Sequence, residues 1–286
     1  MQLVAYGAQD IYLTGNPQIT FFKVVYRRHT NFSMESIEQT FNGSADFGKK
    51  VSCTISRNGD LIHNVYLETT ISEMAETNND LLKWVNKLGY ALVNEVEVEI
   101  GGQRIDKHYG VWMEIWSELT HCQQKMECLD KMVSNGSTSG KTLYVPLQFW
   151  FCKNPGCALP LIALQYHEVK INITFNALNK LHTDLGAALT TTPSMSSASL
   201  YVDYIYLDTD ERRRFAQVSH EYLIEQLQFT GEESANTRHT LNFNHPVKEL
   251  VWVTRNNDNT SRNLHFNYDN GVKASGVVDM GTGTPT

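Results

Sequence analysis

Apolar and polar side chains alternate with a period of two along much of this chain. Between Val169 and Phe175 every second residue is apolar, and the residues between them are polar. Segments 51–56 and 95–100 alternate in the same way. Because successive side chains of a β-strand point to opposite faces, each pattern predicts a strand with one face on a core and the other in a polar environment.

Further runs rich in β-branched and aromatic residues predict additional strands. These runs are residues 19–26, 61–71, 143–151, 200–207, 223–229 and 247–254. Clusters of glycine, asparagine and proline separate them and indicate turns. Residues 179–199 are rich in Thr, Ser and Ala, and we expect them to form a long surface loop.

Only two segments have the spacing of an amphipathic helix. The apolar faces consist of Leu81, Trp84, Val85 and Leu88 in the first segment, and of Trp112, Ile115, Trp116 and Leu119 in the second. We expect Gly89 to end the first helix. Many short strands, few helices and regular turns predict an all-β antiparallel sandwich or barrel, and the strands do not alternate with helices as in a parallel α/β sheet.

Composition narrows the class further. The 286 residues are 41% hydrophobic and 19% charged, which is too apolar for a disordered chain and long enough for two domains or one large β domain. The net charge of −7 does not fit a sequence-independent nucleic-acid binder. No apolar run approaches the ~20 residues of a membrane helix, and residues 1–7 lack the features of a secretory signal.

Segment 135–142, with the sequence NGSTSGKT, looks like a phosphate-binding loop but fails its spacing. A P-loop needs four residues between its first glycine and the Gly-Lys-Thr, whereas three separate Gly136 from Gly140. A predicted strand also follows the segment instead of preceding it. We therefore expect a flexible surface loop and no bound nucleotide.

The cysteines are odd in number and widely spaced. They are Cys53, Cys122, Cys128, Cys152 and Cys157. An odd count without a secretory signal favours free thiols in a reducing compartment. A structural zinc site that also used His121 would need two tight ligand pairs, which this spacing does not provide.

Glu95, Glu97 and Glu99 lie on one face of a predicted strand. Catalytic carboxylates need one desolvated member, so we expect a solvated or subunit-facing stripe instead. The basic clusters 27–29 and 212–214 are short, and we expect them to pair with acidic neighbours across a strand or a subunit contact. The sequence contains neither H-E-x-x-H nor G-x-S-x-G. We therefore predict no catalytic, cofactor-binding or metal residue and no enzyme activity.

The remaining signal is carried by eight blocks of sequence that follow one another along the chain. They are residues 3–10, 12–23, 26–28, 55–61, 100–109, 159–169, 221–226 and 243–246. These blocks strongly resemble the major capsid proteins of nucleocytoplasmic large DNA viruses.

That resemblance implies a double jelly roll, in which two antiparallel sandwiches share one chain and short helices occupy inserted loops. It implies a structural subunit of an icosahedral capsid that forms homotrimeric, pseudo-hexagonal capsomers. The implied partners are other copies of the chain, neighbouring capsomers and minor capsid proteins, without cofactors, direct nucleic-acid contact or membrane insertion. The implied location is the virion, with assembly in the host cytoplasm.

We expect residues 1–215 to form the N-terminal jelly roll and residues 216–286 to begin a second, incomplete one. A short echo supports a duplication, because Ile37-Glu38-Gln39 precedes Gly43 much as Ile224-Glu225-Gln226 precedes Gly231. The second segment has roughly 70 residues, too few for another complete sandwich.

Two other function classes stay open at this point. A jelly roll can also be a binding module, for example for glycans, and an exposed concave face with aromatic and Asn/Asp side chains would favour that function. An enzyme would need a deep pocket with converging polar groups and a perturbed titratable residue.

Overall fold

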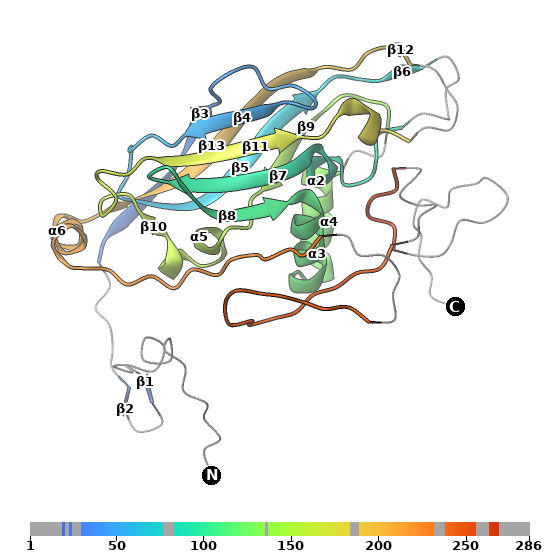
Figure 1. The fold of residues 1–286 in the computed structure, drawn as a ribbon. Coiled ribbons are helices and arrows are strands. Elements are labelled where there is room, and N and C mark those ends of the chain that lie inside the picture. Colours follow the sequence, from blue (N-terminus) through green and yellow to red (C-terminus); the bar gives the residue numbers. More distant parts are fainter. Residues whose placement is uncertain are drawn as a thin grey trace.

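The computed structural model describes residues 19–20, 23–24, 30–76, 83–134, 137–183, 189–231, 238–255 and 263–268. Two antiparallel sheets pack face to face within it (Figure 1). The first sheet contains β3 (Phe32–Thr40), β5 (Leu61–Ile71), β9 (Lys141–Pro146), β10 (Leu159–Pro160) and β13 (Met195–Leu207). The second contains β4 (Lys50–Thr54), β7 (Val93–Ile100), β8 (Gln103–Tyr109) and β11 (Val169–Phe175).

Strand order shows how the chain wraps around the core. The first sheet runs β10–β5–β13–β3 with β9 also paired to β5, and the second runs β4–β11–β7–β8. The chain repeatedly crosses between the sheets, from β3 to β4, from β4 to β5, from β5 to β7 and from β8 to β9. This connectivity is a jelly roll, and it confirms the predicted antiparallel sandwich.

Alternating residues of both sheets form the core between them. On β11, Val169, Ile171, Ile173 and Phe175 are all at most 2% exposed, while the polar residues between them are half-buried. The strand β5 alternates in the same way from His63 to Ile71, while Leu61 and Ile62 before it are both buried. For β11 the period-two pattern therefore predicted both the strand and the face that it buries.

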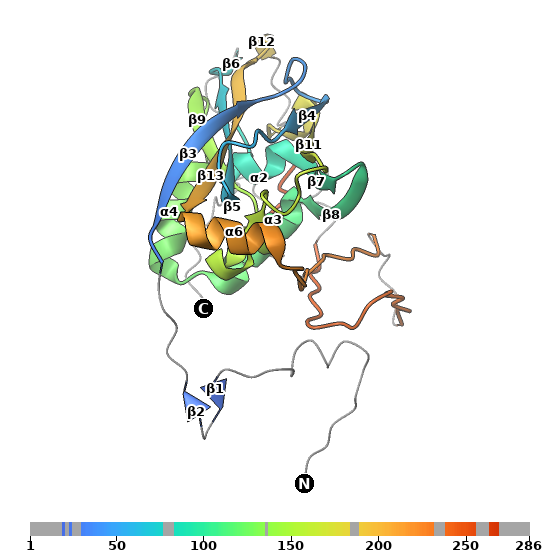
Figure 2. The ribbon, with the colours of Figure 1, turned by 90° about the vertical axis from the view of Figure 1, so that its left-hand side faces the viewer.

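Smaller strands and five helices complete the described chain. The strands are β1 (Ile19–Thr20) paired with β2 (Lys23–Val24), and β6 (Ala75–Glu76) paired with β12 (Leu189–Thr191). The helices are α2 (Leu88–Leu92), α3 (Gly110–Thr120), α4 (Gln123–Val133), α5 (Trp150–Lys153) and α6 (Thr209–Gln217), with 3-10 turns η1 (Pro155–Cys157) and η2 (Leu178–Lys180). The helix α6 caps one end of the sandwich, as the turned view in Figure 2 shows.

The first predicted helix is in the wrong place. The helix α2 begins at Leu88, and Trp84 instead forms an isolated β-bridge with His182. Gly89 lies inside this helix, at a position where the neighbouring strand β9 leaves too little space for a side chain. A Cβ on Gly89 would lie 2.7 Å from a methyl carbon of Val145 on β9. The glycine therefore permits close packing and does not end a helix.

The second predicted helix is confirmed as α3, but its buried face is different. The residues that face the interior are Gly110, Met113, Glu114 and Ser117. The predicted stripe is half-buried at Trp112, Ile115 and Trp116, and Leu119 is 61% exposed. Glu114 thus occupies the core side of α3, where it forms an ion pair with Lys87.

Other sequence predictions need correction where helices and short strands interrupt them. Segment 143–151 is split between β9 and α5, and segment 179–199 contains part of η2, the strand β12 and the start of β13. The helices α4 and α6 were not predicted. Segments 223–229 and 247–254 form no strand, because no neighbouring strand in the described chain pairs with their backbone groups.

Candidate interaction surfaces

The segment that resembles a phosphate-binding loop is held against the sandwich. Carbonyl oxygens of Ser137 and Thr138 accept backbone hydrogen bonds from Trp84 and Met74. A Cβ on Gly140 would lie 2.9 Å from the carbonyl oxygen of Ile71. The described part of this loop is therefore pinned to the chain around β5, whereas we expected a flexible loop; residues 135–136 lie outside the described chain.

All five cysteines are free thiols. Cys53 is buried in the core, and burial raises the pKa of its thiol to about 11. Cys122 and Cys128 are exposed. Across the described ranges, no group of three His, Cys, Asp or Glu side chains is arranged to hold a metal ion.

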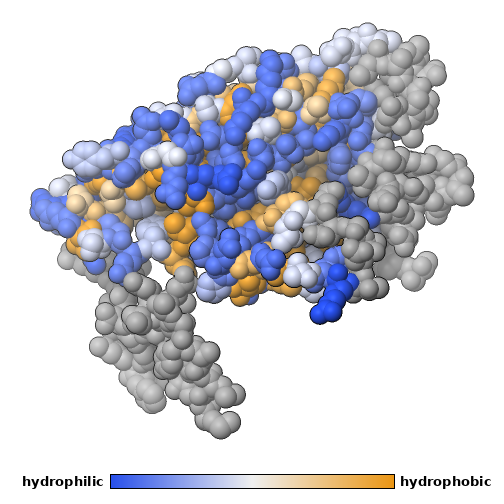
Figure 3. Space-filling view, viewed as in Figure 1, coloured by the Kyte–Doolittle hydropathy of each residue, from blue (hydrophilic) through white to orange (hydrophobic). Residues whose placement is uncertain are grey.

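Glu95 and Glu97 of β7 belong to a charged network on the outer face of the second sheet, whereas Glu99 accepts a hydrogen bond from the amide of Asn172. Glu97 accepts hydrogen bonds from Lys50 and Arg104, each at 3.1 Å, and Glu95 forms an ion pair with Lys107. Burial by itself raises the pKa of Glu97, but the hydrogen bonds from Lys50 and Arg104 outweigh it and hold the pKa below its usual range. Figure 3 shows mainly hydrophilic residues on this side of the molecule. The stripe is therefore an ion-paired outer surface and not a pair of catalytic carboxylates.

The outer face of the first sheet combines tyrosines with carboxylates. Tyr66 donates a hydrogen bond to Asp203 at 3.2 Å. Tyr201 lies beside Glu68 and Glu38, whose charges raise the pKa of its phenol. At one end of this face, Phe32 on β3 is 66% exposed. Exposed aromatic residues on a flat sheet face are typical of protein interfaces.

The basic cluster at residues 212–214 lies on the helix α6 and connects it to Asp60. Arg212 donates from Nε and Nη2 to the carboxylate of Asp60, which also accepts a hydrogen bond of 2.8 Å from the backbone of Leu207. Asp208 caps the N-terminus of α6. The predicted pairing with an acidic neighbour is confirmed for Arg212. The other basic cluster, residues 27–29, lies outside the described chain.

Residues 222–229 run along the edge strand β8. The backbone N–H of Leu227 donates to Asp106 Oδ1 at 3.2 Å, and the rings of Phe229 and Tyr109 lie 5.1 Å apart. Asp106 is buried and its other oxygen lies 2.8 Å from Nε2 of His108. The side chain of Gln226 also donates to the carbonyl oxygen of Ile105, so this segment contacts β8 chiefly through side chains.

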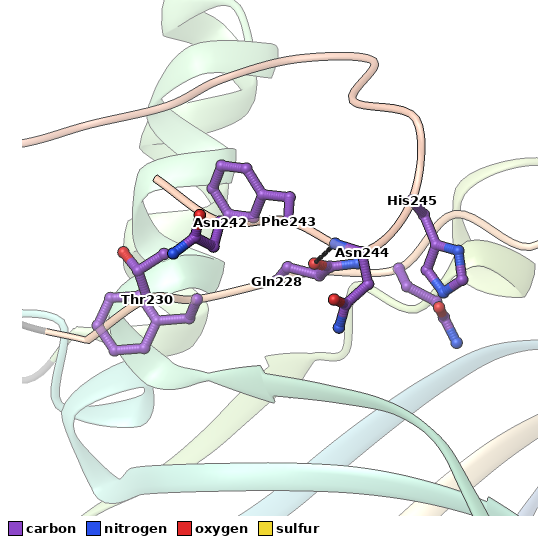
Figure 4. Close-up of a pocket in the computed structure, with 8 residues that line it drawn as sticks. Gln228, Thr230, Asn242, Phe243, Asn244 and His245 are labelled. Atoms are coloured by element: carbon purple, nitrogen blue, oxygen red, sulfur yellow. Dashed lines mark hydrogen bonds between the residues drawn. The ribbon is translucent and has the colours of Figure 1, made fainter. Parts of the chain in front are cut away.

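Beyond β8, two extended segments enclose an open groove of about 420 Å³ (Figure 4). It is lined by Gln226, Gln228, Phe229, Thr230, Asn242, Phe243, Asn244 and His245. Oε1 of Gln228 accepts a hydrogen bond of 3.0 Å from the backbone of Asn244. Its one titratable lining residue, His245, has no acid or base partner in the groove, so this lining offers no acid–base pair.

Sequence reasoning missed three buried acidic residues, which are Asp60, Asp106 and Glu114. A signal was present for Asp106. On β8 the side chains of Asp106 and His108 occupy the alternate, inward-facing positions where apolar residues are expected. Polar residues at core positions of a strand indicate a buried polar pair, and here Asp106 pairs with His108.

Comparison with known proteins gives the family. A family model described as "Major capsid protein N-terminus" matches residues 20–208, and another, "Large eukaryotic DNA virus major capsid protein", matches residues 211–282. The chain belongs to this major capsid protein family. The resemblance seen in the sequence is thereby confirmed.

Individual relatives from this family are similar over most of the chain. The major capsid protein of Pyramimonas orientalis virus is 64% identical over 266 residues, covering 89% of this chain and 64% of the relative. That of Paramecium bursaria Chlorella virus 1 is 50% identical over 263 residues, covering 88% of this chain and 59% of the relative. The chain thus spans less than two thirds of the length of either protein.

Solved capsid structures share the fold. A quasi-atomic structure of the PBCV-1 virus capsid matches with a TM-score of 0.65 and 46% identity, covering 79% of this chain and 57% of that one. The Faustovirus major capsid protein matches with a TM-score of 0.59 at 10% identity, covering 73% and 60%, which shows the fold alone. These matching structures are capsid proteins with a double jelly-roll fold. These relatives give no support to a glycan-binding module. No helix of the described chain is long and apolar enough to cross a membrane.

Proposed function

We propose that this chain is a structural subunit of an icosahedral viral capsid, without catalytic function. The observation that carries the proposal is the likeness to the PBCV-1 capsid structure, with a TM-score of 0.65 at 46% identity. It is supported by the connectivity of the two sheets and by relatives named major capsid proteins. We place the protein in the virion shell, with assembly in the host cytoplasm.

The proposed unit of assembly is a homotrimer with a pseudo-hexagonal outline. Its partners are other copies of the chain, neighbouring capsomers and minor capsid proteins, and we propose neither direct nucleic-acid contact nor membrane insertion. Exposed aromatic and apolar residues such as Phe32 and Tyr144 on the first sheet support a buried contact, because such side chains are enriched at interfaces. Closed cyclic symmetry would bury the same patches in every copy.

We propose residues 1–215 as the N-terminal jelly roll and residues 216–286 as the start of a second one. The division is supported by the two family models, which match residues 20–208 and 211–282. Limited proteolysis tests it: we expect cleavage after about residue 230 and a resistant core that ends near residues 212–222. Equal resistance along the whole chain of the isolated protein would contradict the division.

Mass spectrometry of purified virions tests the function. We expect peptides of this chain in the washed capsid shell at a copy number close to that of the most abundant shell protein. Its absence from virions of the virus that encodes it, while it is present in infected cells, would contradict a structural role. For the trimer, light scattering of the purified protein should give three times 32.5 kDa, and a stable monomer at micromolar concentration would count against it.

A further inference from the structure

Residues 263–268 contact the N-terminal jelly roll through side chains that lie far from their partners in the sequence. The acceptor surface consists of η2 with the residues that follow it, and of α3. Asn263 Nδ2 donates to the carbonyl oxygens of Asn179 and His182 at 2.7 and 2.8 Å. Nε2 of His265 lies 2.8 Å from the carbonyl oxygen of Lys180. Three neighbouring backbone acceptors are thus taken by two side chains of one short segment.

The other half of the contact is a buried carboxylate. The side chain of Glu114 on α3 is 2% exposed. Its Oε1 forms an ion pair of 3.0 Å with Lys87, and its Oε2 accepts a hydrogen bond of 2.9 Å from the hydroxyl of Tyr268. A buried carboxylate is costly unless both oxygens are satisfied, so Tyr268 supplies what the jelly roll does not supply to Oε2 in the described chain.

Local backbone and apolar packing fit the same arrangement. Asn263 has φ of 60°, a left-handed conformation that asparagine tolerates better than most residues. Phe266 packs against the main core cluster of the sandwich. The segment therefore combines a turn, an apolar contact and side-chain hydrogen bonds at both ends.

We propose that the surface formed by η2 and α3 is a specific binding site for residues 263–268 of this chain. The docked segment, here called the latch, fixes the C-terminal part of the chain on the N-terminal jelly roll. The latch has two contacts, an amide and imidazole contact to η2 and a hydroxyl contact to Glu114. It does not depend on the capsid function. At η2 the bound segment must place hydrogen-bond donors against backbone carbonyls. At α3 it must place a hydroxyl against the carboxylate of Glu114.

The latch also contains a titratable group. Burial lowers the pKa of His265 below its usual range; the hydrogen bond to the backbone of Lys180 opposes this, and the charges of Arg255 and Lys180 add to the lowering. The undocked imidazole, in water, titrates near pH 6.5. Protonation therefore favours the undocked segment, and docking weakens as the pH falls through about 6.5.

Hydrogen–deuterium exchange of the full chain tests the latch with two independent variants. Tyr268→Phe removes the hydroxyl at Glu114, and the double variant Asn263→Ala/His265→Ala removes the contact to η2 without touching the buried carboxylate. In each variant we expect peptides covering residues 178–183 and 263–268 to lose at least about tenfold in protection, because Tyr268→Phe loses a hydrogen bond to a charged group and the double variant loses three neutral ones. The strands β5 and β13 should keep their wild-type protection.

A matched control separates the latch from a general effect of removing a hydroxyl. Tyr166 is 94% exposed, and Tyr166→Phe should exchange as the wild type does in both peptides. Protection within twofold of wild type in both latch variants would overturn the proposal. Loss of protection throughout the sandwich would overturn it as well, since residues 263–268 would then support the core and would not be a separable latch.

Discussion

Replacing Lys87 by methionine would leave the carboxylate of Glu114 buried without its cation. Lys87 Nζ lies 3.0 Å from Glu114 Oε1, and the lysine also contacts the more exposed Glu118. Burial raises the pKa of Glu114, and Lys87 offsets this only in part. Burial would lower the pKa of Lys87 itself, but its bond to Glu118 and the charge of Glu114 outweigh burial and raise it. Methionine keeps an unbranched apolar side chain, one atom shorter than that of lysine, and removes the charge and its hydrogen bonds.

The size of the effect follows from the proton that Glu114 would take up. Removing one partner of a buried ion pair costs about 3–5 kcal/mol when the other stays charged. Protonation sets a limit on that cost. Neutralising a carboxyl whose unfolded pKa is 4.5 costs about 3.4 kcal/mol at pH 7, at 1.36 kcal/mol per pH unit. We therefore expect Lys87→Met to lower the free energy of unfolding by about 3 kcal/mol at pH 7.

The loss of stability in Lys87→Met should change with pH in a defined direction. Burial raises the pKa of Glu114, and without Lys87 no opposite charge in the described chain offsets that rise, so we expect the folded variant to hold a proton that the unfolded state releases above pH 4.5. Stability then falls as the pH rises, by about 1.4 kcal/mol per unit, and the loss should shrink to about 1 kcal/mol at pH 5. Urea unfolding followed by the fluorescence of the five tryptophans measures both values.

Two further variants make the result decisive. Lys87→Met/Glu114→Gln removes the buried charge, and it should recover most of the lost stability and show little dependence on pH. Lys49→Met breaks an exposed ion pair with Asp46 and should change stability by less than about 0.5 kcal/mol. A loss below about 1 kcal/mol at pH 7, or an equal loss at pH 5 and pH 7, would refute the reasoning.

Three other outcomes are expected. Gly89→Ala should lower stability by about 1–3 kcal/mol in thermal unfolding, because its Cβ would overlap a methyl group of β9, and a wild-type melting temperature would contradict that packing. Iodoacetamide at pH 8 should modify Cys122 and leave Cys53 intact in the folded protein, since Cys53 is buried with a thiol pKa of about 11; mass spectrometry of tryptic peptides decides this. Protection factors of residues 263–268 should fall between pH 7.5 and pH 5.5, and His265→Gln should remove that dependence; an unchanged slope would assign it to another group.

Local sequence patterns predicted strands at the positions of β4, β5, β7, β9, β11 and β13, whereas β3, β8 and β10 were not predicted. The predicted ranges of β5 and β11 agree with the structure at both ends, and the alternation identified the buried face of β11. A strand with one face on a core leaves this record because its side chains alternate strictly between two environments. The family could also be recognised from the sequence, because the long blocks that resemble it can be read without knowing which segments pack beside them in the fold.

Tertiary contacts decided the positions where polar and small residues meet the core. Glu114 is on the buried face of α3 because Lys87 and Tyr268, distant in sequence, supply its partners, so the apolar stripe did not identify that face. Gly89 is required by a methyl group on β9 and not by a helix end. Periodicity records only which side of an element is apolar. The partner of a buried charge, and the space left beside a glycine, depend on segments that the fold alone brings together.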